Sequence, residues 1–209
     1  VHITEMTSKI KRCGECNNDG CGAPVPDLIR KDPKLEPILN AYQPEYKNTN
    51  VSDYVRLIEI IIGQQLSGAA ADTIFSRLTK ILGQDFLPHQ FLEINNVQFA
   101  EIGISKAKKN YCRLISEHAV DEPTYFDWLR NLLPTDQMHE LIKFKGVGIW
   151  TASIFVMSSD IMSDIFAYGD VTLNRVIKQT YELDEVQLDK QIDLILDNWS
   201  PYKTIGTLY

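Results

Sequence analysis

Leu-Ile-Lys-Phe-Lys-Gly-Val-Gly-Ile-Trp-Thr-Ala, at residues 141–152, is a glycine-containing turn between two helical patterns. Gly146 and Gly148 flank one apolar residue, so the chain can turn sharply there and bring its backbone amides close to a ligand. A helix that begins near Ile149 would point its first N–H groups and the positive end of its dipole at an anion. Lys145 lies beside the turn. The stretch therefore has the physical form of a backbone clamp for a phosphate group.

A second informative stretch, Ile-Phe-Ala-Tyr-Gly-Asp-Val-Thr-Leu, covers residues 165–173 and places Asp170 at the head of another helical pattern. An aspartate at this position is a good N-cap, which is a purely structural explanation. A carboxylate fixed at a helix start also favours its ionised form and can face a developing positive charge. The two interpretations are compatible, and the residues alone leave both open.

The glycine hairpin, Trp150 and Asp170 in this register resemble the helix-hairpin-helix/Gly-Pro-Asp DNA glycosylase superfamily. Tyr168 and Gly169 stand where that family often has a proline-containing loop. The likeness extends over roughly residues 28–209 and is to the DNA-3-methyladenine glycosylase II (alkylbase) branch, in a compact form without an N-terminal β domain. It implies a two-lobed helical fold with a DNA and base cleft between the lobes.

The apolar pattern is helical throughout, without sustained period-two alternation, and predicts an all-α fold. A buried helix follows Ser52 and breaks at residues 63–65, and a second runs from Ser67 to Gly83. Further helices are predicted at 88–101, 105–118, 123–132, 135–143, 149–159, 171–181 and 187–198. We expect an extension at 1–25, a terminal lobe of 26–52 plus 165–209, and a central lobe of 53–164 that carries the hairpin.

Composition limits the partners and the location. No apolar run approaches the ~18 residues of a membrane span and no signal-peptide pattern is present, so we expect a cytoplasmic monomer that does not bind membranes. The net charge of −7 argues against a protein that binds nucleic acid through a general positive field. Local clusters compensate in part: Lys106, Lys108, Lys109 and Arg113 in one, and Lys143 and Lys145 in another. A few phosphate contacts made largely by backbone amides are consistent with this balance.

The resemblance assigns the DNA contacts. The break Gly-Gln-Gln-Leu-Ser at 63–67 is by itself an ordinary helix junction, with Ser67 as a cap. In alkylbase relatives, the residue aligned with Gln65 enters the duplex and fills the gap left by an extruded base. The resemblance further implies DNA binding by Lys145, Gly146, Val147 and Gly148, and a monovalent cation held by the backbone carbonyls of Ile142, Phe144 and Gly146.

Two aromatic residues are candidates for the base pocket. Strand-cleaving members of the superfamily have a lysine where this chain has Trp150, and a tryptophan cannot form their Schiff base, so the resemblance implies no lyase activity. Tyr202, in the segment Trp-Ser-Pro-Tyr-Lys at 199–203, would close the pocket opposite Trp150. Each aromatic has a plain packing role as its alternative. Ile154 stands where some relatives have a pocket tyrosine.

Three cysteines, Cys13, Cys16 and Cys21, crowd into the N-terminal segment at a spacing that can chelate zinc. A fourth ligand could come from His2, Cys112, His118 or water, and the alternative is a tail without metal. The spacing does not match the four-cysteine iron–sulfur run of the strand-nicking relatives.

The resulting hypothesis is a monofunctional DNA glycosylase that flips alkylated purines (3-methyladenine and 7-methylguanine) out of double-stranded DNA and hydrolyses their N-glycosidic bond without a catalytic cofactor. Asp170 would be the catalytic carboxylate, with Asp160 and Asp164 as solvated loop charges. The alternatives are a glycosylase for a deaminated or oxidised base and a non-catalytic hairpin protein that binds damaged DNA.

Overall fold

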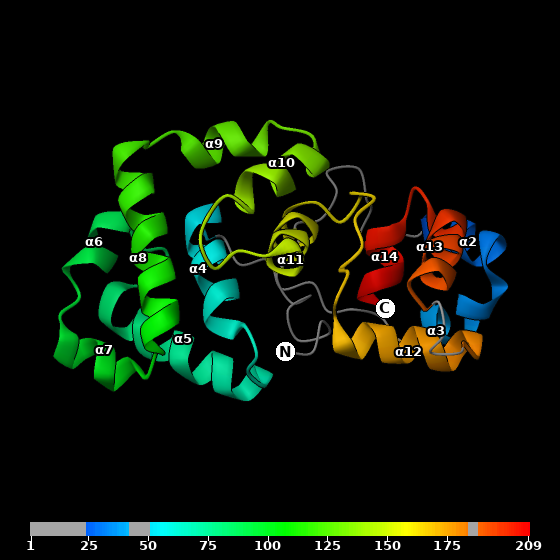
Figure 1. Cartoon of the computed structure of the whole chain (residues 1–209), viewed down its shortest axis with the longest axis horizontal. Helices are drawn as coiled ribbons and strands as arrows, with labels where there is room; N and C mark the ends of the chain where they lie inside the picture. The colour runs from blue at the N-terminus through cyan, green and yellow to red at the C-terminus, as the bar shows by residue number, and fades with distance from the viewer. Residues whose placement is uncertain (1–23, 42–50, 184–187) are drawn as a thin grey trace. The chain divides into compact units, whose positions relative to one another are not determined.

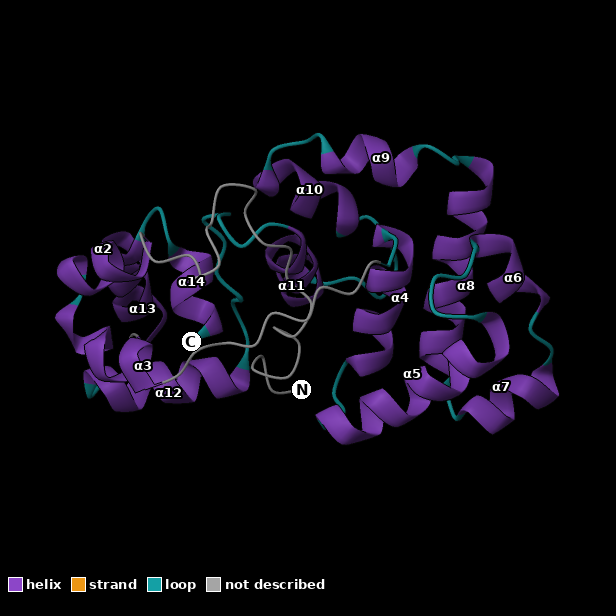
Figure 2. Ribbon diagram, turned by 180° about the vertical axis from the view of Figure 1, so that it is seen from behind, coloured by secondary structure: helices purple, strands orange, loops and turns teal. Residues whose placement is uncertain are grey.

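The computed structural model describes residues 24–41, 51–183 and 188–209, and each regular element in these ranges is a helix (Figures 1 and 2). The prediction of an all-α fold is confirmed. The described part of the chain divides into two compact units: residues 51–155 form the first, and residues 24–41 join the described residues of 156–209 in the second. The division falls within α11 (Ile149–Ser159). Among the described helices, none is long and apolar enough to cross a membrane.

The first unit is built around α4 (Asp53–Gly63), in which every residue except Glu59 is buried. This helix packs against α5 (Gly68–Leu82) and α8 (Lys106–Asp121). The other helices of this unit, green to yellow in Figure 1, are α6 (Pro88–Glu93), α7 (Asn96–Ile102), α9 (Tyr125–Arg130), α10 (Pro134–Leu141) and the start of α11. Each fully buried aliphatic side chain of α4 contributes about 1.5–3 kcal/mol to folding.

Serine caps set the starts of three helices in this unit. The hydroxyls of Ser52, Ser67 and Ser105 each accept the N–H of the residue three positions later, at 3.4 Å. These bonds satisfy amides that have no partner inside their own helix, and each cap is worth about 1 kcal/mol. The predicted helix starts after Ser52 and Ser67 therefore have the expected physical cause.

The second unit packs around Trp199, whose side chain is 1% exposed. Its elements are α2 (Pro24–Lys31), η2 (Pro33–Leu35), α3 (Glu36–Ala41), the end of α11, α12 (Val171–Tyr181), α13 (Leu188–Trp199) and α14 (Lys203–Leu208). The indole Nε1 donates to Asp32 at 3.0 Å, and the hydroxyl of Tyr181 donates to the same carboxylate. Gly206 lies directly against the indole: a Cβ added at this residue would come within 2.6 Å of the ring.

Some helix predictions were wrong in detail. Helix α2 begins at Pro24, inside the stretch assigned to an extension, and its prolines lie in the first turn, where a missing N–H costs little. The single helix predicted at 88–101 is two helices, because Asn95 caps α7 by accepting the amides of Val97 and Gln98 at 2.9 and 3.0 Å. Asp32 caps the short η2, and α3 begins only after η2 ends.

Candidate active site and nucleic-acid interface

The glycine hairpin joins α10 to α11 at the position that the sequence predicts. Phe144 accepts the amide of Val147 at 3.0 Å to close the turn, and Gly146 has a φ of +91°, which suits glycine. A Cβ on Gly146 would also lie 2.2 Å from the ring of Tyr111, so a side chain has no room there. Gly148 has open space instead. The conformation and the packing therefore both require glycine at 146.

The hairpin presents its backbone to solvent and keeps its apolar residue inside. Val147 is 5% exposed, whereas Lys145, Gly148 and Ile149 are exposed. The first bond of α11 runs from the amide of Ala152 to the carbonyl of Gly148 at 3.0 Å, so the N-terminus of this helix lies at the hairpin. A helix N-terminus favours negative charge and amide contacts to phosphate. Val147 anchors the turn, and the exposed backbone around it is suited to meet a ligand.

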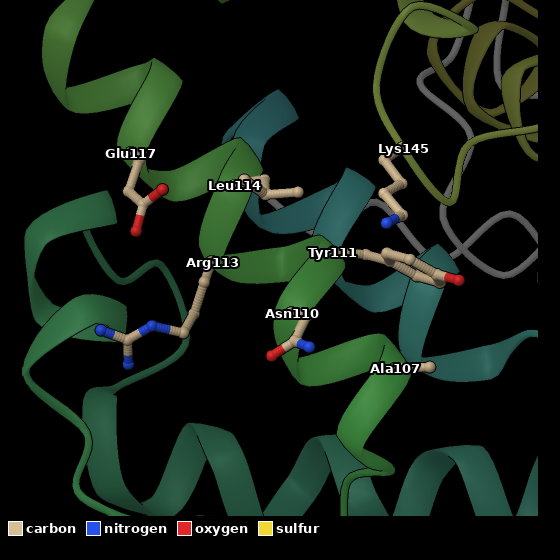
Figure 3. Close-up of a pocket in the computed structure, with 7 residues that line it drawn as sticks. All are labelled: Ala107, Asn110, Tyr111, Arg113, Leu114, Glu117 and Lys145. Carbon is tan, nitrogen blue, oxygen red and sulfur yellow. The ribbon is translucent and has the colours of Figure 1, made fainter.

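An open hollow of about 530 Å³ adjoins the hairpin on the outer side of α8. Figure 3 shows the side chain of Lys145 close to the ring of Tyr111, with Asn110 and Arg113 on the same helix, α8. Its lining residues are Ala107, Asn110, Tyr111, Arg113, Leu114, Glu117 and Lys145. Among the described residues, no ion pair uses Arg113 or Lys145, so both cations remain available to an anionic ligand.

The junction between α4 and α5 exposes the residue predicted to enter DNA. Gln65 is exposed and has a φ of +55°, a left-handed conformation that few non-glycine residues adopt. Such strain persists only when the surrounding structure holds it, and it is concentrated at functional sites. Lys108 of α8 provides part of that support, because its Nζ donates to the carbonyls of Ile62 and Gln64 at 2.8 and 2.5 Å. Burial lowers the pKa of Lys108.

The side chain of Gln64 was missed by the sequence reasoning. Its Nε2 donates to the carbonyl of Gly146 at 2.9 Å and to the hydroxyl of Thr151 at 2.9 Å. The half-buried Gln64 thus connects the α4–α5 junction with the hairpin and the first turn of α11. The only signal in the sequence was the pair of glutamines at the junction, of which the resemblance assigned a role to the second.

Two of the carbonyls expected to hold a monovalent cation already accept a hydrogen bond. The carbonyl of Phe144 accepts from Val147 and that of Gly146 accepts from Gln64. A carbonyl oxygen has two lone pairs, so each keeps one for a cation, and the third carbonyl is that of Ile142. The arrangement is compatible with the predicted cation.

Trp150 lies in the first turn of α11, half-buried, directly before the buried Thr151. Ile154, one turn further along, is 3% exposed. Because residues three and four apart share a helix face, Trp150 and Ile154 lie on the same side of α11. The aromatic residue therefore sits next to the hairpin in the unit that also carries Gln65.

In the second unit, Asp170 caps α12. Its carboxylate accepts the amide of Leu173 at 2.9 Å, and the side chain is only 5% exposed. Gly169 before it has a φ of +81°, which turns the chain into the helix. The Tyr168 hydroxyl donates to Asp193 at 2.9 Å. Burial is the larger cause, and the hydrogen bond to this carboxylate the smaller one, that raises the pKa of Tyr168 to about 12. The structural role predicted for Asp170 is thus present, and the buried carboxylate is rigidly placed.

Tyr202 lies in the loop between α13 and α14 and is half-buried. Its amide donates to the carbonyl of Trp199 at 2.7 Å. The pKa of Asp27 of α2 is lowered mainly by Arg30 and, to a smaller extent, by the hydroxyl of Tyr202. Lys31 of α2 donates to the carbonyl of Ser200 at 2.6 Å. Tyr202 is therefore held beside α2.

The expectation that Asp164 is a solvated loop charge was wrong. Its carboxylate accepts the Ser200 hydroxyl at 2.7 Å, and the amide and ammonium of Lys203 at 3.1 and 3.0 Å. Burial works against ionisation, but these hydrogen bonds outweigh it and lower the pKa of Asp164. Asp160 accepts the amide of Met162 at 2.9 Å and so shapes a turn. Asp164 instead fixes the loop that carries Tyr202.

The predicted zinc ligands Cys13, Cys16 and Cys21, with His2, lie outside the described residues. Of the other proposed ligands, Cys112 is fully buried in α8, where burial raises the pKa of its thiol. His118 packs edge-on against Tyr125 and Phe144, with ring centroids 4.6 and 5.1 Å away. Within the described ranges, no group of three or more His, Cys, Asp or Glu side chains could hold a metal ion.

The hairpin, the cap at Asp170 and the helical fold define a class of protein. The model of the HhH-GPD superfamily of base excision DNA repair proteins matches residues 58–201, so the chain belongs to this family.

Particular relatives are similar over most of the chain. The DNA-3-methyladenine glycosylase of Saccharomyces cerevisiae is 28% identical over 79% of this chain, which spans 61% of that protein. The crystal structure of DNA-3-methyladenine glycosidase from Bacillus halodurans has a TM-score of 0.74 at 28% identity, covering 90% of this chain and 88% of that one. A Schizosaccharomyces pombe 3-methyladenine DNA glycosylase, Mag1, in complex with abasic DNA, shares the fold with a TM-score of 0.77 at 19% identity, covering 88% and 93%.

Proposed function

We propose that this chain is a monofunctional DNA glycosylase that excises alkylated purines, such as 3-methyladenine and 7-methylguanine, from duplex DNA and leaves an abasic site. The observation that carries the proposal is the buried carboxylate of Asp170 at the start of α12, in a chain of the HhH-GPD family. The names of the relatives, which are 3-methyladenine glycosylases, support the choice of substrate class.

The hairpin and the exposed junction supply the DNA contacts. The N-terminus of α11 and the exposed backbone at Gly148 favour binding to a phosphate, which positions the protein without reading sequence. Lys145 adds a positive charge beside it, and the carbonyls of Ile142, Phe144 and Gly146 would hold a monovalent cation that adds further positive charge there. Gln65 enters the duplex and fills the space of the extruded base, whose lost stacking amounts to about a few kcal/mol. The bound species is one copy of the chain on duplex DNA.

The flipped base lies against aromatic side chains. Trp150 and Tyr202 are the candidates, and an aromatic face attracts a cationic alkylated base by about 0.5–2 kcal/mol. Neither residue has an amine that could attack the sugar. This supports hydrolysis by water, without strand cleavage.

The chemical step needs one carboxylate. The C1′–N bond breaks and its electron pair leaves with the base, which becomes neutral if it was a cation. The carboxylate of Asp170 stabilises the positive charge that develops on the sugar. Water then adds its oxygen to C1′ and gives its proton to the carboxylate, as in glycoside hydrolysis. A cationic base is already a good leaving group, so no strong general acid is required.

The test is base release from methylated duplex DNA by the unaltered chain and by Asp170→Asn. Asparagine caps a helix about as well as aspartate, so the fold should be retained. Loss of the charge should lower the single-turnover rate about a thousandfold, with little change in binding to abasic DNA. A variant that keeps its activity within about tenfold would contradict the catalytic assignment. Faster release of hypoxanthine or uracil than of both methylated purines by the unaltered chain would contradict the substrate class.

A further inference from the structure

Gln64 uses both its backbone and its side chain to connect separate parts of the first unit. Its carbonyl accepts the ammonium of Lys108 at 2.5 Å, while its Nε2 donates to Gly146 and Thr151, each at 2.9 Å. Both protons of the amide are therefore used, one on the hairpin carbonyl and one on the first turn of α11. The residue next to it in the chain is the strained Gln65.

Helix α8 supports both ends of this connection. Lys108 holds the end of α4, and Tyr111, three residues further along α8, fills the space beside Gly146. Residues three apart lie on one face of a helix, so one turn of α8 contacts the junction and the hairpin together. The hairpin is thus held by a ring on α8 and by a hydrogen bond from Gln64.

We propose that Gln64 is a positioning residue that holds the exposed Gln65 and the phosphate-binding hairpin at a fixed spacing, so that both meet DNA as one preorganised surface. This inference rests on the proposed function. Groups that are fixed before binding lose less conformational freedom on binding than mobile groups. A donor-free side chain at this position would leave the hairpin carbonyl and Thr151 without their shared partner and would release the junction from the hairpin.

Gln64→Met is the main test, because methionine has a similar length and no donor. Duplex DNA with an abasic site should bind about tenfold more weakly, whereas inhibition by free 3-methyladenine should change by less than twofold. A substitution that only destabilised the protein would weaken abasic-DNA binding and free-base inhibition by similar factors. The matched control is Gln98→Met in the same unit, far from the hairpin in the sequence. Gln98 is half-buried, and the substitution removes the hydrogen bond that its Oε1 accepts from the amide of Asn95 at 3.0 Å. It should bind abasic DNA like the unaltered chain.

Two further variants keep the proposal testable if Gln64→Met does not fold. Thr151→Val removes only the hydroxyl acceptor and should weaken abasic-DNA binding about two- to threefold. Lys108→Met, combined with Thr151→Val, should weaken binding by less than the product of the single effects, because both act through Gln64.

Unchanged DNA binding in Gln64→Met, or an equal loss in the free-base assay, would overturn the positioning role. If Gln64→Met does not fold, unchanged abasic-DNA binding in Thr151→Val would overturn it. If the unaltered chain releases no base, the proposed function is contradicted, and abasic-DNA binding still tests the positioning role of Gln64.

Discussion

The hydroxyl of Ser200 donates to the carboxylate of Asp164 at 2.7 Å, although the two residues are 36 positions apart. Lys203 binds the same carboxylate from the other side of Tyr202, through its amide and its ammonium. One acidic side chain therefore fixes both flanks of the residue proposed to close the base pocket. Its hydrogen bonds stabilise the ionised form, which makes their contribution dependent on pH.

Asp164→Asn should lower the free energy of unfolding at pH 7. The pKa of Asp164 is lowered in the folded chain, so the stabilisation is complete above the unfolded-state pKa and is lost as the pH falls through the folded-state pKa. The difference between the unaltered chain and the variant should therefore shrink in acid. Urea unfolding at several pH values measures it. Asp160→Asn controls for the change in net charge, and a difference that stays constant with pH would count against the assignment.

No covalent adduct should form when the chain acts on methylated DNA in the presence of borohydride. The resemblance to the family places Trp150 at the position expected for the lysine of strand-cleaving members, and an indole cannot form a Schiff base. Strand breaks should appear only after treatment with alkali or heat. A glycosylase with lyase activity serves as the positive control on the same substrate. A trapped complex in comparable yield would show that the chain is not monofunctional.

Gly146→Ala should destabilise the protein by about 2–4 kcal/mol, because it combines a left-handed backbone with overpacking. The added Cβ would lie 2.2 Å from the ring of Tyr111, at a residue whose φ is +91°. Gly148→Ala is the matched comparison, since its Cβ would meet nothing within 4 Å. Thermal unfolding of both variants measures the contrast. Equal stability of the two would mean that the hairpin tolerates a different turn.

Lys145→Ala should weaken binding to damaged and undamaged duplex alike. Each phosphate contact contributes about −0.9 to the slope of log K against log salt, so the slope should become shallower by about that amount. Lys80→Ala, an exposed lysine of α5, controls for net charge and should leave the slope unchanged. If both variants behave alike, Lys145 acts only through the overall charge.

The local elements were predictable because their signals are contained in short stretches. Helices α11 and α12 have the predicted bounds, since a glycine hairpin precedes one and Asp170 caps the other. Helix α14 was missed, because it is one short segment that follows a proline and is stabilised by packing of Gly206 on Trp199. Short helices of this kind depend on tertiary contacts rather than on their own sequence.

The connections between elements could not be predicted in the same way. Gln64 and Gly146 are 82 residues apart, and Asp164 and Lys203 are 39 apart. Nothing in their neighbouring residues distinguishes a bridging glutamine from a solvent-facing one, or an anchoring aspartate from a loop charge. Such pairs depend on how the helices are arranged in three dimensions. The residue pattern predicts the fold class, all-α, but not that arrangement.

The ammonium of Lys108 faces the carbonyls at the end of α4, so one charge of the basic cluster on α8 is used inside the protein. Lys109 is also engaged, over the ring of Phe99 and on the amide oxygen of Asn96. With a net charge of −7, little attraction to intact duplex is left. We expect such a chain to leave undamaged DNA quickly, and to search a genome by many brief encounters rather than by long sliding.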